Sequence, residues 1–150
     1  MAYVLPPELQ SLLAHWLVRR EDRPIPDRRD VPLRELTAWY DHLAIIDIAA
    51  YGDLRRYAFA FCGQALHHRL GREAMKLELR DLDKPVWVEL LKTLERGHEA
   101  PAIGYAPAAR RNGTIVTYCD LVLPLSDRSS RATQLLMGSY AVAHHAGIKA

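Results

Sequence analysis

The stretch that decides the fold is residues 43–62, LAIIDIAAYGDLRRYAFAFC. Its first half is apolar and β-branched, Gly52-Asp53 marks a turn, and the second half alternates aromatic and small side chains. Such alternation is typical of a strand, because successive side chains point to opposite faces of a sheet. We therefore predict a hairpin of two strands, at about 43–50 and 55–62. The side chains expected to face the helices on one side of this hairpin are Tyr57, Phe59 and Phe61, with Ala58 and Ala60 on the other side.

The last third of the chain predicts three more strands. They lie at about 102–108, 114–123 and 133–142, and the first two are joined by Arg110-Arg111-Asn112-Gly113. Asn-Gly is a strong hairpin signal, since both residues tolerate the positive φ angles of the tight turn. The remainder, from 143–150, is expected to be a C-terminal tail.

Two amphipathic helices are predicted outside the strands. The first carries one apolar stripe at helical spacing, formed by Leu9, Leu12, Leu13, Trp16 and Leu17. The second spans about 84–97 and ends at Gly97. Between the first helix and the strands, residues 21–32 are rich in proline and arginine, and we interpret them as an ordered connector. The predicted organisation is therefore a helix and connector over 1–32, a domain over 33–142 and the tail.

Composition places the chain among ordinary globular domains. It has 150 residues, is 49% hydrophobic and carries a net charge of +2, from 20 basic and 18 acidic residues. That balance does not indicate a nucleic-acid-binding protein. The start has no basic region followed by an apolar run, and no run is long enough to span a membrane. We expect a cytoplasmic protein with no membrane or nucleic-acid partner.

Strands at the two ends of the chain with helices between them predict an α+β fold with an antiparallel sheet. The order, together with several short motifs, resembles the PAS (Per-Arnt-Sim) family, and within it a bacterial group of short, stand-alone PAS proteins. The residues that carry the resemblance are Trp16, Pro24, Pro26, Arg28, Arg29, Asp30, Pro32, the stretch 42–47, Tyr57, Phe59, Phe61, Gly63, Gly71, Gly97, Pro101 and the stretch 123–126.

The resemblance implies a five-stranded antiparallel sheet with short helices on one face and an N-terminal amphipathic helix. It implies a non-catalytic sensor or protein-interaction domain in bacterial signalling. It does not imply a ligand, because PAS domains bind many different molecules and some bind none. A small ligand in the cavity between sheet and helices is therefore a candidate feature of the domain. The alternative is a small-molecule-binding protein or an enzyme that uses the same cavity. Since only a short tail follows the last strand, we expect no output domain and a separate, unknown downstream protein.

The chemistry-bearing residues do not form a recognisable catalytic or metal motif. Adjacent histidines, as in His67-His68, point to different sides of a helix and chelate a metal poorly, so no metal is expected. Haem would require His67 or His98 as its axial ligand, and neither lies within the helix at 84–97. Cys62 and Cys119 lie in strands, without the motif that surrounds a flavin-reactive cysteine. We therefore predict no cofactor, a colourless protein and no enzymatic activity.

Two groups of residues are candidate interaction sites. The candidate ligand pocket consists of aromatic side chains and one histidine: Tyr57, Phe59, Phe61, His67, Trp87, Tyr105 and Tyr118. The same aromatic residues would otherwise simply fill the core. The apolar stripe of the first helix must be covered by its own sheet or by a second copy. We predict a symmetric homodimer with an interface at Leu9, Leu12, Leu13, Trp16 and Leu17.

The connector carries a local excess of arginine. The arginines of this region are Arg19, Arg20, Arg23, Arg28 and Arg29, and Arg110-Arg111 form a second basic turn. They either pair with the acidic residues of the same stretch or bind an acidic protein or a phosphate-bearing ligand. We favour pairing within the connector.

Overall fold

The computed structural model describes residues 4–51, 54–70, 84–109 and 113–145. The predictions made at Gly52-Asp53, Gly71 and Arg110–Asn112 lie outside these residues. The elements, in chain order, are α1 (Pro7–Arg20), the short 3-10 helices η1 (Arg28–Asp30), η2 (Leu33–Glu35) and η3 (Thr37–His42), β1 (Leu43–Tyr51), β2 (Leu54–Cys62), α2 (Gln64–Leu70), α3 (Lys84–Arg96), β3 (Ala102–Ala109), β4 (Ile115–Ser126) and β5 (Ala132–His145).

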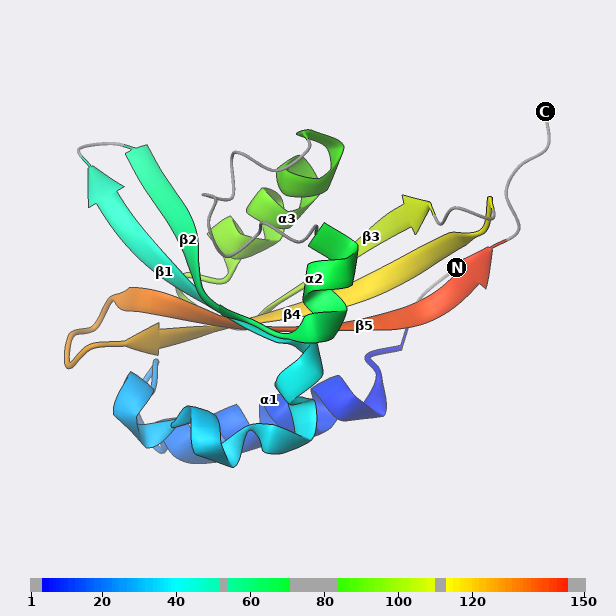
Figure 1. The fold of residues 1–150 in the computed structure, drawn as a ribbon. Helices are drawn as coiled ribbons and strands as arrows, with labels where there is room; N and C mark the ends of the chain where they lie inside the picture. Colours follow the sequence, from blue (N-terminus) through cyan, green and yellow to red (C-terminus); the bar gives the residue numbers. More distant parts are fainter. Residues whose placement is uncertain (1–3, 52–53, 71–83, 110–112, 146–150) are drawn as a thin grey trace.

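The five strands form one antiparallel sheet in the order β2-β1-β5-β4-β3. The predicted α+β class and the five-stranded antiparallel sheet are confirmed. Helices α2 and α3 lie on one face of the sheet, whereas α1 and the 3-10 helices of the connector lie on the other (Figure 1). The protein therefore has three layers, and the sheet has an apolar core on each side.

The inner core is the cluster between the sheet and α2 and α3. Its buried side chains are Ala44, Ile46, Tyr57, Phe59, Cys62, Leu66, Leu70, Leu90, Leu94, Val122, Leu135 and Met137. Leu66 and Leu70 come from α2, four residues apart, and Leu90 and Leu94 have the same spacing on α3. Each helix therefore turns one stripe toward the strands.

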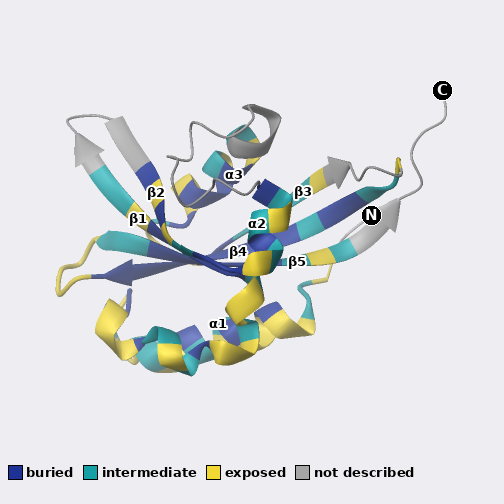
Figure 2. Cartoon of the chain, viewed as in Figure 1, coloured by how far each residue is buried: buried dark blue, intermediate teal, exposed yellow. Residues whose placement is uncertain are grey.

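The outer core is the cluster between the opposite face of the sheet and α1. It contains Leu9, Leu12, Trp16, Val31, Leu36, Leu43, Cys119, Leu121, Leu123, Leu125 and Leu136. Figure 2 shows α1 buried where it meets the sheet and exposed on its outward side. Helix α1 thus belongs to the same folded unit as the strands.

This arrangement bears on the predicted homodimer interface. Leu9, Leu12 and Trp16 are at most 1% exposed, because the sheet of the same protomer covers them. Leu13 also packs against the outer core, and Leu17 remains 41% exposed beside the exposed Val18. The three innermost residues are therefore not available to a second copy while α1 is docked, and the homodimer itself stays a prediction.

The two faces of β2 differ from the prediction at one aromatic residue. Tyr57 and Phe59 lie in the inner core as expected, whereas Phe61 packs against the outer core. The cause is a β-bulge: Ile45 pairs with Phe61 and Ile46 with Phe59, which leaves Ala60 as an extra residue. One inserted residue reverses the faces of everything after it, because the side-chain period of a strand is two.

The C-terminal strand is longer than predicted. Strand β5 continues to His145, and His144 and His145 pair with Val116 and Ile115. The expected tail thus begins as part of the sheet. Within the described ranges, every helix is too short or too polar to cross a lipid bilayer.

Candidate functional site

A buried ion pair lies between α2 and the sheet. Arg69 Nη1 is 2.5 Å from Asp120 Oδ1, and Nη2 donates to Oδ2 at 3.0 Å. Arg69 Nη1 also donates to Ser139 Oγ at 2.7 Å. The side chains of Arg69 and Asp120 are 5% and 1% exposed. This two-pronged geometry is the strongest form of arginine–carboxylate pairing.

The sheet register brings the partners of Arg69 together. Asp120 of β4 is paired directly with Ser139 of β5, so both side chains point to the same face. Tyr118, two residues before Asp120, lies on that face, and the guanidinium of Arg69 is 4.6 Å from its ring centroid. Burying a charged pair costs desolvation energy that a hydrophobic pair would not. Such a cluster at the helix–sheet boundary is therefore a candidate functional feature.

A cleft of about 360 Å³ lies between α3 and β3, next to the ion pair. It is lined by Glu89, Lys92, Thr93, Arg96, Ile103, Gly104, Tyr105, Ala106 and Asp120. Asp120, which is 1% exposed, is the most buried of the polar residues in this lining. At Gly104 a Cβ atom would come within 2.1 Å of Thr93 Oγ1, so glycine lets α3 approach β3 closely there.

The predicted pocket residues separate into several locations. Tyr57 and Phe59 fill the inner core and Tyr118 lies beneath Arg69, whereas Phe61 packs on the outer side. Tyr105 lines the cleft and also packs against the outer core. The side chain of Trp87 lies outside the described residues. The assignment of these residues to one ligand pocket stays a prediction.

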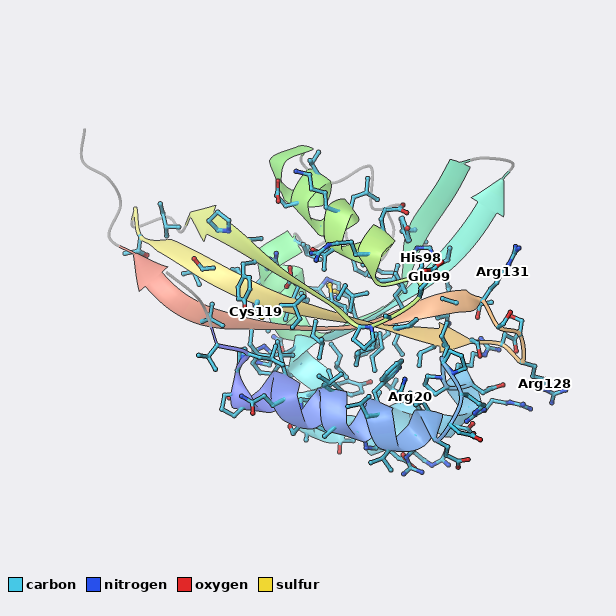
Figure 3. The ribbon with its side chains drawn as sticks, turned by 180° about the vertical axis from the view of Figure 1, so that it is seen from behind. Arg20, His98, Glu99, Cys119, Arg128 and Arg131 are labelled. Carbon is cyan, nitrogen blue, oxygen red and sulfur yellow. The ribbon has the colours of Figure 1, made fainter. Side chains whose placement is uncertain are left out.

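A second polar cluster joins β2 to the end of α3. The hydroxyl of Tyr57 donates to Glu95 Oε1 at 2.8 Å and lies 2.7 Å from Nε2 of His98. Figure 3 labels His98 just after α3, beside Glu99. His98, one of the two histidines considered as a haem ligand, is thus engaged through its ring nitrogen. The other, His67, lies on α2 with Nδ1 buried and without a hydrogen-bond partner in the described part of the chain.

The two cysteines are buried thiols. Desolvation raises the pKa of Cys62 to about 11, and desolvation likewise raises the pKa of Cys119 to about 11. Both thiols are therefore protonated at neutral pH, which makes them poor nucleophiles and poor metal ligands. Among the described residues, no three His, Cys, Asp or Glu side chains converge to hold a metal ion.

Sequence reasoning missed Arg69, Asp120 and Ser139. One signal was available for Asp120: it is the single charged residue in the apolar stretch 115–125. A lone charge in a strand with apolar residues on both faces predicts a buried and paired group. Its partner could not be found, because Arg69 lies 51 residues away.

The comparisons with known proteins are informative about the fold alone. No family model matches the sequence, and no curated protein matches it. A solved light-oxygen-voltage domain, studied with a flavin analogue, aligns with a TM-score of 0.50 at 16% sequence identity. The alignment covers 74% of this chain and 84% of that chain. The likeness supports a fold of the PAS type; membership of the bacterial stand-alone group stays a prediction.

Proposed function

We propose that the chain is a non-catalytic PAS-like sensor in bacterial signalling that binds a small molecule in the cleft between α3 and β3. The observation that carries the proposal is the Arg69–Asp120–Ser139 cluster, which links α2, β4 and β5 and has one member, Asp120, in the lining of that cleft. A ligand in the cleft comes within reach of Asp120, and so of the buried charged pair that holds α2 to the sheet.

The lining of the cleft suggests the kind of ligand. Ala106 supplies apolar surface, Thr93 a hydroxyl and Asp120 a carboxylate, and Glu89, Lys92 and Arg96 of α3 add charged side chains. The side chain of Ile103 packs against the outer core instead. Small-molecule sites typically combine apolar walls with a few polar groups that fix orientation. We infer a small molecule with an apolar part that packs on Ala106 and polar groups that reach Thr93 and Asp120.

Strands β4 and β5 connect the cleft on one face of the sheet with α1 on the opposite face. Asp120 and Ser139 form one register pair, and the adjacent pair is Leu121 with Gly138. A Cβ atom at Gly138 would lie 2.7 Å from Cδ2 of Leu9, so α1 rests directly on this part of β5. A ligand that competes for Arg69 or Asp120 would shift β4 against β5. Such a shift would change how α1 packs on β5. Helix α1 is the proposed output element.

The alternative is an enzyme or a passive binding protein that uses the same cleft. Asp120 is an unsuitable general base, because both of its oxygens are bound by Arg69. The two thiols are protonated at neutral pH, and the Tyr57 hydroxyl is bound by Glu95. These engagements favour the sensor over the enzyme.

The partners follow from the sensor role. A second copy of the chain would meet the exposed strip of Leu17 and Val18 on the outer side of α1. A separate downstream protein would read the position of α1. Both partners are proposals. The interface proposed for the second copy keeps two residues of the predicted homodimer interface, Leu13 and Leu17.

Native mass spectrometry of the purified full chain tests ligand binding. We expect a fraction of the protein to carry a non-covalent small molecule that is released on unfolding. Ala106→Phe would place a ring in the cleft and should remove the bound mass. Ala58→Phe adds the same ring at an exposed position of β2 and is the matched control, which should retain it.

Two results would overturn the proposal. One is a protein that carries no ligand from several expression conditions. The other is equal loss of the bound mass in Ala106→Phe and Ala58→Phe, because the occupant would then not lie in this cleft.

A further inference from the structure

The connector and the β4–β5 loop meet at one end of the molecule. Asp27 forms an isolated parallel bridge with Ser126, and Ser126 N–H donates to the carbonyl oxygen of Pro26 at 2.9 Å. The backbone N–H of Arg128 donates to Asp27 Oδ2 at 3.1 Å. Two segments that are about 100 residues apart in the sequence are thus held together.

A groove of about 290 Å³ lies along this junction. It is lined by Arg23, Pro24, Ile25, Asp27, Ser126, Arg128, Ser129 and Ser130, and we call it the connector groove. Pro24 supplies exposed apolar surface from the connector, whereas Ile25 is only 7% exposed. The β4–β5 loop supplies Arg128 and two serines.

The connector groove has one arginine, Arg128, without an ion-pair partner among the described residues, although Asp127 lies next to it in the sequence. Asp27 accepts hydrogen bonds from the side chain and the backbone N–H of Arg29, and its pKa is lowered to about 2, so this carboxylate is already satisfied. Arg23 is held by Asp30 at 2.7 Å. In the described part of the chain, no carboxylate forms an ion pair with Arg128 or Arg131. Figure 3 shows these two side chains extending outward from the β4–β5 loop, with Arg20 of α1 toward the same end.

Arg128 occupies an unfavourable backbone conformation for its residue type. Its φ angle is +60°, in the left-handed region that favours glycine or asparagine. The loop could turn here at lower cost with glycine. In this conformation the backbone N–H of Arg128 donates to Asp27 Oδ2. That bond fixes the point from which the exposed guanidinium extends beside the groove.

We propose that the connector groove docks an acidic peptide segment of a partner protein, with carboxylates at Arg128 and Arg131 and an apolar side chain on Pro24. An isolated phosphate fits less well, because it would leave the apolar surface uncovered and would place more negative charge near Asp27. The proposal goes beyond ligand binding in the cleft: it concerns another surface, beside the C-terminal end of α1. A partner docked there would be in contact with the region that holds the proposed output helix.

Titration of the full chain with synthetic peptides tests this surface. The probes are eight-residue peptides of alternating glutamate and leucine, and matched peptides with glutamine for glutamate. Amide chemical shifts in ¹⁵N-labelled protein report where they bind. We expect the glutamate peptide to shift residues 23–27 and 126–131, and the glutamine peptide to bind roughly tenfold more weakly, since opposite-charge contacts stabilise the docked state.

A charge-reversal pair separates the groove from general electrostatic attraction. Arg128→Glu should weaken binding of the glutamate peptide by roughly tenfold or more. Arg34→Glu, the same change at an exposed site of η2, should leave the affinity for this peptide within about twofold of the wild-type value. The proposal is overturned by shifts located elsewhere, by equal loss in both variants, or by no binding of the peptide. It is also overturned if inorganic phosphate or anionic lipid vesicles bind through Arg128 while the peptide does not. None of these results depends on occupancy of the cleft.

Discussion

The indole Nε1–H of Trp16 donates a hydrogen bond of 2.9 Å to the carbonyl oxygen of Pro124. The bond is buried and joins α1 to β4 across 108 residues of sequence. Trp16 also has the largest fully buried side chain among the described residues. Docking of α1 therefore depends on a buried polar contact as well as on apolar burial.

Trp16→Phe should retain much of the ring burial and remove the donor. We expect a loss of about 1–3 kcal/mol in the free energy of unfolding, because the Pro124 carbonyl loses a buried partner. Trp39→Phe is the matched control, since Trp39 donates to the Glu8 carbonyl at 2.8 Å at an exposed position. Urea unfolding compares the two variants. An equal loss of unfolding free energy in both variants would show that the buried bond of Trp16 stabilises the fold no more than the exposed bond of Trp39.

The bulge at Ala60 predicts unequal effects for the two phenylalanines of β2. Phe59→Ala should cost about 3–5 kcal/mol, because the ring is buried in the inner core. Phe61→Ala should cost less than about 2 kcal/mol, because that ring is only partly buried, on the outer side. Denaturant unfolding of both variants is the measurement. A larger loss from Phe61→Ala would contradict the face assignment.

Asp27 predicts an acid dependence of stability. Its folded-state pKa of about 2 lies below the ordinary value of 3.8, so its contribution is present above pH 4 and is lost as the pH falls toward 2. Asp27→Asn should therefore be less stable than wild type by about 1–3 kcal/mol at pH 7. The difference should shrink as the pH falls from 4 to 2. A difference that is constant across this range would refute the role of the charge.

The buried cysteines predict slow thiol chemistry. With burial raising both pKa values to about 11, Cys62 and Cys119 should resist a disulfide reagent at pH 8 in the folded protein. Both should react within minutes in denaturant. One thiol that reacts rapidly in the folded state would contradict this assignment and would reopen redox chemistry at that cysteine.

Much of the fold could be predicted from local patterns. The alternation in 55–62 and the stripe of Leu9, Leu12 and Trp16 both identify their elements, because each reflects the geometry of a single segment. Gly113 adopts a φ of +83°, as expected for the turn. The end of β5 was less predictable, since the pairing of His145 with Ile115 depends on a neighbouring strand rather than on local hydrophobicity.

The candidate site was less accessible to prediction. The bulge at Ala60 moves Phe61 to the outer face without any glycine or proline to mark it, so the aromatic pattern misleads about the face of Phe61. The pairing of Arg69 with Asp120 depends on how α2 crosses the sheet. The groove depends in the same way on the meeting of Asp27 with Arg128. Contacts between distant segments have no signature in a single sequence.

The central claim is that the Arg69 cluster on one face of the sheet is coupled to α1 on the other. Hydrogen exchange of the amides in α1, followed by mass spectrometry, tests it most directly. The variant is Arg69→Gln, which breaks the ion pair with Asp120. Phe59→Ala is the control, because it destabilises the same face and leaves that pair in place.

We predict that Arg69→Gln raises the exchange rate across residues 7–20 more than Phe59→Ala does, when the two variants are compared at equal loss of global stability. Such a result would show that α1 responds to the ion pair beyond general unfolding. Exchange in α1 that rises equally in both variants, or that stays at the wild-type rate in Arg69→Gln, would contradict the account.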